Sequence, residues 1–144
     1  MEIYQISIFI ENQAGKLSEV TDILAEKNID LRAINIAETA DYGILRVITK
    51  NSQRTVDAMK EHGFIATRTP VLCVGVKDEP GGLNTLLHIL AKEKIDVEYM
   101  YSIFGQKEGL AYMVLRVENI PAVREILKQH DIYTAECADL GIIL

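Results

Sequence analysis

The 144-residue chain has little of the chemistry that marks a metal site or a membrane segment. Its two cysteines, Cys73 and Cys137, lie far apart and form no Cys-x-x-Cys pair, so we interpret them as buried free thiols. No apolar run approaches the roughly 20 residues that span a bilayer. The N-terminus also lacks the basic segment and apolar core of a signal peptide. We therefore expect a cytoplasmic protein with no membrane partner.

Positive charge and catalytic motifs are also scarce. Lys and Arg number 15 against 21 Asp and Glu, which leaves a net charge of −6 and argues against a nucleic-acid partner. His62, His88 and His130 form no ligand pair on one helix face, and His62 and His130 are expected at helix ends. Serine elbow motifs and glycine-rich phosphate loops are missing. We expect no metal, no cofactor and no enzymatic activity.

What the chain does have is a repeated turn. Residues 77–83, Lys-Asp-Glu-Pro-Gly-Gly-Leu, lie between an alternating apolar run and a helical pattern that begins at Leu83. Residues 11–17 have the same layout 66 positions earlier. Further along, residues 46–47 align with residues 116–117 at an offset of 70, which implies a loop four residues longer in the second half. The chain is therefore a tandem repeat of one small domain, with domains at 1–69 and 70–144.

Each half predicts the element order β-α-β-β-α-β. In the first half we expect strands at 3–10, 31–38, 42–49 and 64–69, with helices at 16–27 and from 52 to a stop at 63. In the second half we expect strands at 71–76, 97–104, 110–118 and 132–137, with helices that begin near 83 and 121. This order predicts an α+β fold of two ferredoxin-like repeats, with antiparallel sheets side by side and helices on one face. The apolar tail 140–144 is expected to be buried on the core or on another subunit.

The turns resemble those of a known family. A motif Asp-x-Pro-Gly-x-Leu after a strand, with Ala-x-x-x-Ile-(Asn/Asp)-(Ile/Val) near the end of the next helix, is similar to that of ACT domains. It stands here at residues 78–83 and 91–97, and the resemblance covers nearly the whole chain as two ACT domains. The first half has Asn12 for the aspartate and Ala14 for the proline. Its turn therefore holds a ligand differently, or not at all.

The resemblance implies a regulatory protein that binds a small ligand, usually an amino acid, at the interface between ACT domains. The positions carried over from the family are Asn12, Ala14, Gly15, Lys16, Leu17, Asp30, Asp78, Pro80, Gly81, Gly82, Leu83 and Asp96. Unpaired N–H groups at a helix start suit the carboxylate of an amino acid, and Asn or Asp side chains suit its ammonium group. Each aspartate has an alternative interpretation, in which it caps a helix or closes a turn.

We expect a homodimer whose partners are an amino acid and a regulated metabolic enzyme. The alternative is a protein-interaction or assembly module of the same fold with no small-molecule ligand. An acyl-phosphate hydrolase on this scaffold needs an arginine in the first turn to hold the phosphoryl group, and neither turn contains one. The sequence leaves open which amino acid is bound and whether one or both turns bind it.

Overall fold

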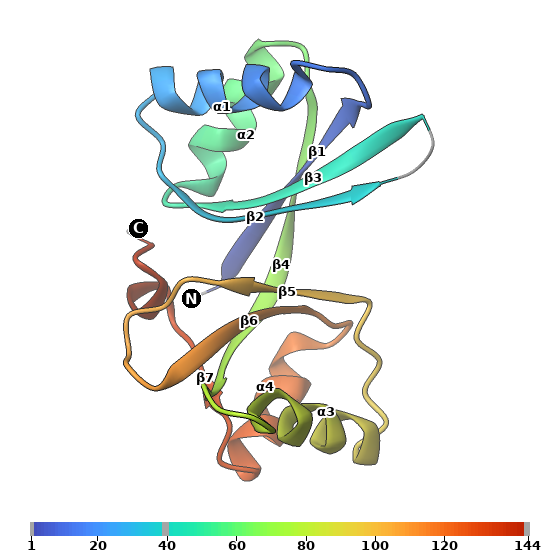
Figure 1. Ribbon diagram of the computed structural model, residues 1–144, viewed down its shortest axis with the longest axis vertical. Helices are drawn as coiled ribbons and strands as arrows, with labels where there is room; N and C mark the ends of the chain where they lie inside the picture. The colour runs from blue at the N-terminus through green and yellow to red at the C-terminus, as the bar shows by residue number, and fades with distance from the viewer. Residues whose placement is uncertain (1, 39–40, 143–144) are drawn as a thin grey trace. The chain divides into compact units, whose positions relative to one another are not determined.

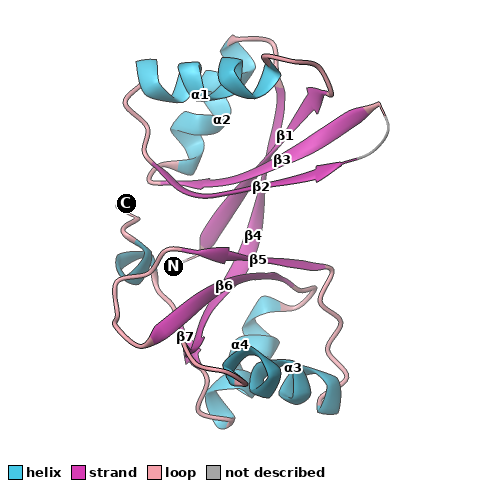
Figure 2. Cartoon of the chain, viewed as in Figure 1, coloured by secondary structure: helices cyan, strands magenta, loops and turns pink. Residues whose placement is uncertain are grey.

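A computed structural model describes residues 2–38 and 41–142, which form four α-helices and seven β-strands (Figure 1, Figure 2). The helices are α1 (Lys16–Glu26), α2 (Ser52–Glu61), α3 (Gly82–Lys92) and α4 (Ile120–Gln129). The strands are β1 (Ile3–Glu11), β2 (Leu31–Glu38), β3 (Tyr42–Thr49), β4 (Ile65–Lys77), β5 (Tyr99–Ile103), β6 (Leu110–Arg116) and β7 (Tyr133–Thr134), and a 3-10 helix, η1 (Cys137–Leu140), follows. The chain divides into two units, mainly Tyr4–Thr69 (the first unit) and Pro70–Gly141 (the second unit).

In the first unit the strand order is β2-β3-β1-β4, and both helices lie on one face of the strands (Figure 1). β1 pairs antiparallel with β3, where Ile6 lies opposite Val47, and β3 pairs antiparallel with β2. Alternate strand residues face the helices, whose apolar residues recur about every 3.6 positions and meet them. The core that results includes Ile6, Ile8, Ile10, Val20, Ile23, Leu24, Leu45, Val47, Val56 and Met59.

The second unit repeats this arrangement. β4 lies between β6 and β7, and β5 pairs with the other side of β6. Its core includes Leu72, Val74, Val76, Leu86, Leu90, Leu115, Val117, Val123 and Leu127. In both units the strand before the turn is therefore central and the helix after the turn packs over the sheet. The predicted α+β fold of ferredoxin-like βαββαβ repeats is confirmed.

Strand β4 differs from the prediction, which placed separate strands at 64–69 and 71–76. The structure has one strand, Ile65–Lys77, whose first residues belong to the first unit and whose later residues belong to the second. Proline removes one N–H donor but keeps a φ near −65°, so extended backbone can pass through Pro70. The prediction of eight separate strands is wrong, and the described residues form seven.

The strand register also corrects the alignment of the two halves. Ile6 lies opposite Val47, and its counterpart Leu72 lies opposite Leu115. Leu115 is thus the counterpart of Val47, at an offset of 68 (115 − 47) and not 70. The N-cap residues of α2 and α4 keep the same offset. The second half therefore has two extra residues between the paired positions of β5 and β6, and the predicted four is wrong.

The end of the chain is less regular than predicted. The strand expected at 132–137 is reduced to Tyr133–Thr134, and Cys137 begins η1. Glu136 and Asp139 exchange the two hydrogen bonds of a capping box, which stabilises this short helix. Leu140, the first residue of the apolar tail, is fully buried, as expected. Residues 143–144 of that tail lie outside the described residues.

Candidate ligand-binding site

The two predicted turns, residues 12–15 before α1 and 78–81 before α3, have the same backbone hydrogen bonds. Each is closed by three N–H···O=C bonds of 2.9 to 3.3 Å at matching positions. In the first turn the N–H groups of Gln13, Lys16 and Glu19 donate to Glu11, Gln13 and Gly15; in the second, those of Glu79, Gly82 and Thr85 donate to Lys77, Glu79 and Gly81. The first turn therefore has the backbone of the second, although Asn12 and Ala14 replace the aspartate and the proline.

Both helices that follow these turns begin without a side-chain cap. Each N-cap is a glycine with positive φ, 90° at Gly15 and 88° at Gly81, and neither α1 nor α3 has a capping side chain. By contrast, Asn51 and Asn119 cap α2 and α4, and each side chain accepts a hydrogen bond from a backbone N–H in the first turn. The helix starts at the two turns are thus left without the side-chain acceptor that the other two helices have. Such helix starts bind carboxylates.

The two turns differ in the charge at the first helical turn. α1 begins with Lys16, whose Nζ lies 3.1 Å from Oε2 of Glu19. α3 begins with Gly82, where a Cβ atom would overlap the carbonyl oxygen of Lys77. The first turn of α3, residues 82–85, contains no charged residue. Only the helix start of the first unit therefore carries both a cation and an anion.

The three aspartates predicted to bind the ligand differ in their partners and in their distance from the turns. Asp78 does not cap α3, and neither Asp78 nor Asp96 forms a side-chain hydrogen bond or ion pair within the described residues. Asp30 is paired with Arg32 at 3.2 Å and with Lys50 at 3.9 Å. The turn precedes α1 and Asp30 follows it, and a helix of 11 residues is about 16 Å long. Asp30 therefore cannot contact the same amino acid as the turn of its own unit, nor can Asp96 beyond α3.

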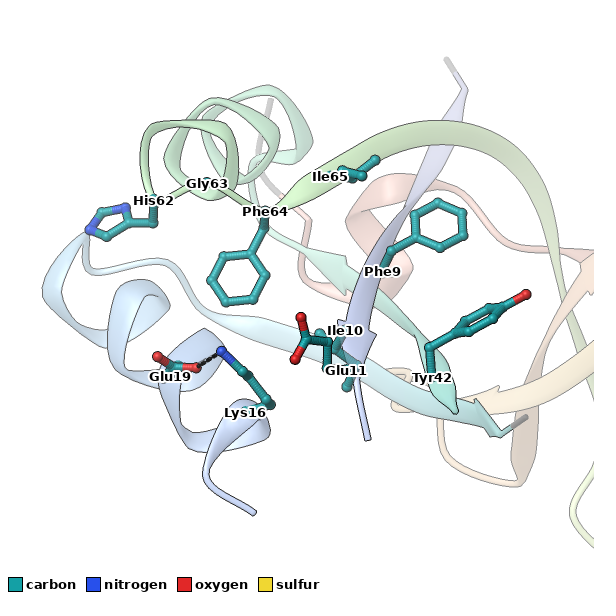
Figure 3. A pocket seen from close by; sticks show the side chains of 10 residues that line it. All are labelled: Phe9, Ile10, Glu11, Lys16, Glu19, Tyr42, His62, Gly63, Phe64 and Ile65. Atoms are coloured by element: carbon teal, nitrogen blue, oxygen red, sulfur yellow. Dashed lines mark ion pairs between the residues drawn. The ribbon is translucent and has the colours of Figure 1, made fainter. Parts of the chain in front are cut away.

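A pocket of about 540 Å³ lies beside the first turn (Figure 3). Its lining comes from the end of β1, the start of α1, the start of β3 and the junction of α2 with β4. The lining residues are Phe9, Ile10, Glu11, Lys16, Glu19, Tyr42, His62, Gly63, Phe64 and Ile65. This volume lies within the range of about 300–1,000 Å³ of small-molecule sites. Of the twelve residues named from the sequence, only Lys16 lines it.

The pocket combines apolar and charged groups. Figure 3 shows the ring of Phe64 between the Lys16–Glu19 ion pair and the ring of Phe9. Nδ1 of His62 lies 2.9 Å from the carbonyl oxygen of Ala58. A carbonyl oxygen only accepts, so Nδ1 carries a proton and Nε2 is the nitrogen open to a further partner. The pocket can therefore contact an apolar group and opposite charges at the same time.

Sequence reasoning missed the apolar wall of this pocket. Phe9 and Ile65 lie on strands at positions that face away from the core, and they are 41% and 66% exposed. A signal was present for Phe9, because Gln5 and Ser7 precede it in the alternation and a polar residue is expected at position 9. A contiguous group of exposed apolar side chains often marks a binding surface. No comparable signal marked Ile65 at the start of a strand.

Other features of the described residues concern metal binding, membrane crossing and the position of the histidines. Among residues 2–38 and 41–142, no three His, Cys, Asp or Glu side chains are grouped so that they could hold a metal ion. The helices in that same part of the chain are too short or too polar to cross a membrane. His62 and His130 are the C-cap residues of α2 and α4, so their predicted position at helix ends is confirmed.

Comparison with known proteins agrees with this architecture. Residues 1–143 match the family model described as ACT domain pair. The chain is 37% identical to the protein BT0572 from Bacteroides thetaiotaomicron, with a TM-score of 0.90 over 99% of this chain and 98% of that one. It has the fold of the aspartate kinase regulatory subunit from Thermus thermophilus in its ligand-free form (18% identity, TM-score 0.66, 90% and 93% covered), and of that from Thermus flavus (17%, 0.63, 90% and 92%). The comparison with curated proteins gives no match. The chain belongs to the ACT domain pair family, as the resemblance of its turns predicted.

Proposed function

We propose that this chain is a non-catalytic regulatory protein that binds a free amino acid at the N-terminal end of α1, of α3 or of both. Each of the two proposed domains, 1–69 and 70–144, contributes one such turn. The observation that carries the proposal is the pair of uncapped helix starts, each preceded by a glycine with positive φ. Membership in a family of regulatory domains supports it.

An amino acid has two charged ends, and each turn offers groups for both. The N–H groups of Lys16 and Gly82 already donate within the turns. Those on either side, at 15 and 17 or at 81 and 83, suit its carboxylate, because the helix dipole adds to their donor capacity. The ammonium group needs an acceptor close by, and Asn12 or Asp78 lies at the start of the same turn. The side chain of Asp78 has no other hydrogen-bond or ion-pair partner within the described residues. Asp30 and Asp96 take no part in a ligand held by the turn of their own unit.

A regulator without catalytic activity acts by changing an association. We propose that the chain forms a homodimer and that its target is a metabolic enzyme. The Thermus thermophilus protein of the same fold is a regulatory subunit of aspartate kinase, which supports this kind of target.

The proposal is tested by a thermal-shift and calorimetric screen of the twenty amino acids on the full chain. We expect at least one to bind, and Asn12→Ala or Asp78→Ala to weaken it about tenfold, because a hydrogen bond to a charged group is lost. Asp22→Ala, an exposed acid in the middle of α1, is the control. No binding by any amino acid contradicts the proposal.

The assembly module without a ligand remains the second candidate, because the edge strand β2 exposes apolar side chains. Ile34 and Ile36 are 50% and 42% exposed. In that case Gly81→Val disturbs folding, since its φ of 88° excludes a branched side chain, but Asp78→Ala leaves every measurable activity intact.

A further inference from the structure

The two units share the turn but differ in the space beside it. Strand pairing defines which residues correspond: Gly75 is the counterpart of Phe9, and Leu110 that of Tyr42. The offset of 68 that α4 shares with α2 makes Tyr133 the counterpart of Ile65. In the first unit Phe9, Tyr42 and Ile65 line the pocket.

In the second unit the corresponding side chains fill this space. A Cβ atom at Gly75 would lie 3.0 Å from Cδ1 of Leu110 and 3.3 Å from Cδ1 of Tyr133, so both side chains pack directly over the glycine. Tyr133 is held in place, because its hydroxyl donates to Oδ2 of Asp139 at 2.6 Å. Nζ of Lys107 lies 3.9 Å from the centre of the same ring. A ligand cannot enter between these groups without displacing them.

A second depression, of about 440 Å³, does touch part of this region. It is lined by Lys128, Asp131, Ile132, Tyr133, Thr134 and Glu136. None of these residues belongs to the turn at 78–81 or to α3, so this depression does not join a helix start to an apolar wall. The turn of the second unit thus matches the family motif better, whereas only the turn of the first unit, among the described residues, has this pocket beside it.

The chemistry of the first pocket indicates what it accepts. Phe9, Phe64 and Ile65 supply an apolar wall, and Lys16 with Glu19 supplies opposite charges at the uncapped start of α1. In the second unit the counterparts of Glu11, Lys16 and Glu19 are a lysine, a glycine and a threonine. Asp78 of that turn offers an acceptor for an ammonium group, but it does not line the depression beside Tyr133. A zwitterion with an apolar side chain matches the first pocket at both its charged and its apolar sides.

We propose that the first unit alone binds the ligand, and that the ligand is a free α-amino acid with a large apolar side chain. This inference rests on the proposed function and names the class of ligand for it. The carboxylate lies at the start of α1, the ammonium group near Glu11, and the side chain against Phe9 and Ile65. The probes are L-phenylalanine and L-leucine, compared with L-alanine and L-aspartate.

Isothermal titration of the full chain tests ligand class and stoichiometry. We expect L-phenylalanine or L-leucine to bind at one site per chain and at least about tenfold more tightly than L-alanine or L-aspartate, because an apolar wall discriminates by size and polarity. Amide NMR shifts should concentrate at 9–19 and 62–65. Tighter binding of L-aspartate, or two sites per chain, overturns the inference.

Matched variants test the location. Ile65→Glu places a charge on the apolar wall and should weaken binding about tenfold or more. Thr67→Glu adds the same charge two residues along the same strand, outside the pocket, and should leave binding unchanged. Both positions are exposed, so both variants should fold. If Asp78→Ala abolishes binding and Ile65→Glu does not, the inference fails and the proposed function stands. If no amino acid binds, both fail.

Discussion

Two adjacent glycines, the last residue of the second turn and the first residue of α3, are required for different physical reasons. Gly81 has a φ of 88°, which side chains avoid, yet nothing lies within 4 Å of the position that its Cβ would take. Gly82 lies outside the positive-φ region, but a Cβ there would overlap the carbonyl oxygen of Lys77. Gly81 is thus constrained by its own backbone, and Gly82 by its neighbour.

We expect Gly82→Ala to lower the free energy of unfolding by about 1–3 kcal/mol, because the overlap with Lys77 must be relieved by moving backbone. This loss is expected although alanine in a helix is intrinsically about 1 kcal/mol better than glycine. Gly15→Ala, which meets empty space, should lose only the roughly 1–2 kcal/mol of a left-handed residue. Urea denaturation measures the free energy of unfolding of both variants. If Gly82→Ala raises it, the prediction from the overlap with Lys77 is wrong.

The cysteines give a prediction about pH. Both are buried free thiols, as predicted, and burial raises the pKa of Cys73 from about 9 to about 12. The unfolded chain loses this proton first, so stability is full below pH 9 and falls as pH rises toward 12. The cost of Cys73→Ala, measured by denaturation of both chains from pH 7 to 10.5, should therefore shrink above pH 9 by up to about 1.4 kcal/mol per pH unit. The titration of tyrosines and lysines contributes equally to both chains and cancels in the comparison. If the difference in free energy of unfolding between the two chains does not change with pH, the prediction is wrong.

At the scale of the elements, two helices are capped and two are not. Asn51→Ala and Asn119→Ala should each lower the free energy of unfolding by about 1 kcal/mol, because each removes the acceptor of an N–H in the first helical turn. Asn12→Ala and Asp78→Ala should change it by less than about 0.5 kcal/mol, because neither side chain caps a helix. Chemical denaturation of the four variants checks this. A loss at Asp78 equal to that at Asn119 indicates a structural role for the carboxylate.

The elements with local signals were predictable. Gly15 and Gly81 mark the starts of α1 and α3, and Asn51 and Asn119 cap α2 and α4, because caps and positive φ act within a few residues. The offset between the halves was misjudged by two because strand side chains alternate with period 2. A slip of two residues keeps every apolar residue on its face, so the pattern alone cannot exclude it. The offset is determined by which strand residues pair with each other, and these residues are far apart in the sequence.

The pocket was less predictable than the turns, for the same reason. It requires Phe9 from β1 and Ile65 from β4 to lie near the start of α1, and no local pattern records that proximity. Strand β4 likewise continues through Pro70, which the sequence pattern marked as a boundary. The turn residues were named correctly as a structural feature, and their role in binding stays a prediction.

At the scale of the whole molecule, duplication has kept one backbone and changed its chemistry. The three hydrogen bonds of the turn are the same in both units, whereas the helix starts carry Lys16 in one and Gly82 in the other. The backbone can be retained because its bonds are made by main-chain groups, which side-chain replacement does not alter. Substitution at the helix start and on the strand faces then makes the two units different binding surfaces.

A regulator must convert binding into a change of association, and the two effects are thermodynamically reciprocal. If the chain is a homodimer, saturating L-phenylalanine should change its dimerisation constant by about 5–150-fold, as measured by sedimentation equilibrium. Because each dimer binds two ligands, the affinity for L-phenylalanine should then differ by the square root of this factor between protein concentrations well below and well above the dimerisation constant. Ile36→Lys, on the exposed edge strand β2, should weaken the dimer and remove this concentration dependence while the affinity of the monomer stays the same. If the bound amino acid does not change the dimerisation constant, the chain does not regulate through self-association. Binding of the amino acid must then act by changing the association with the partner enzyme.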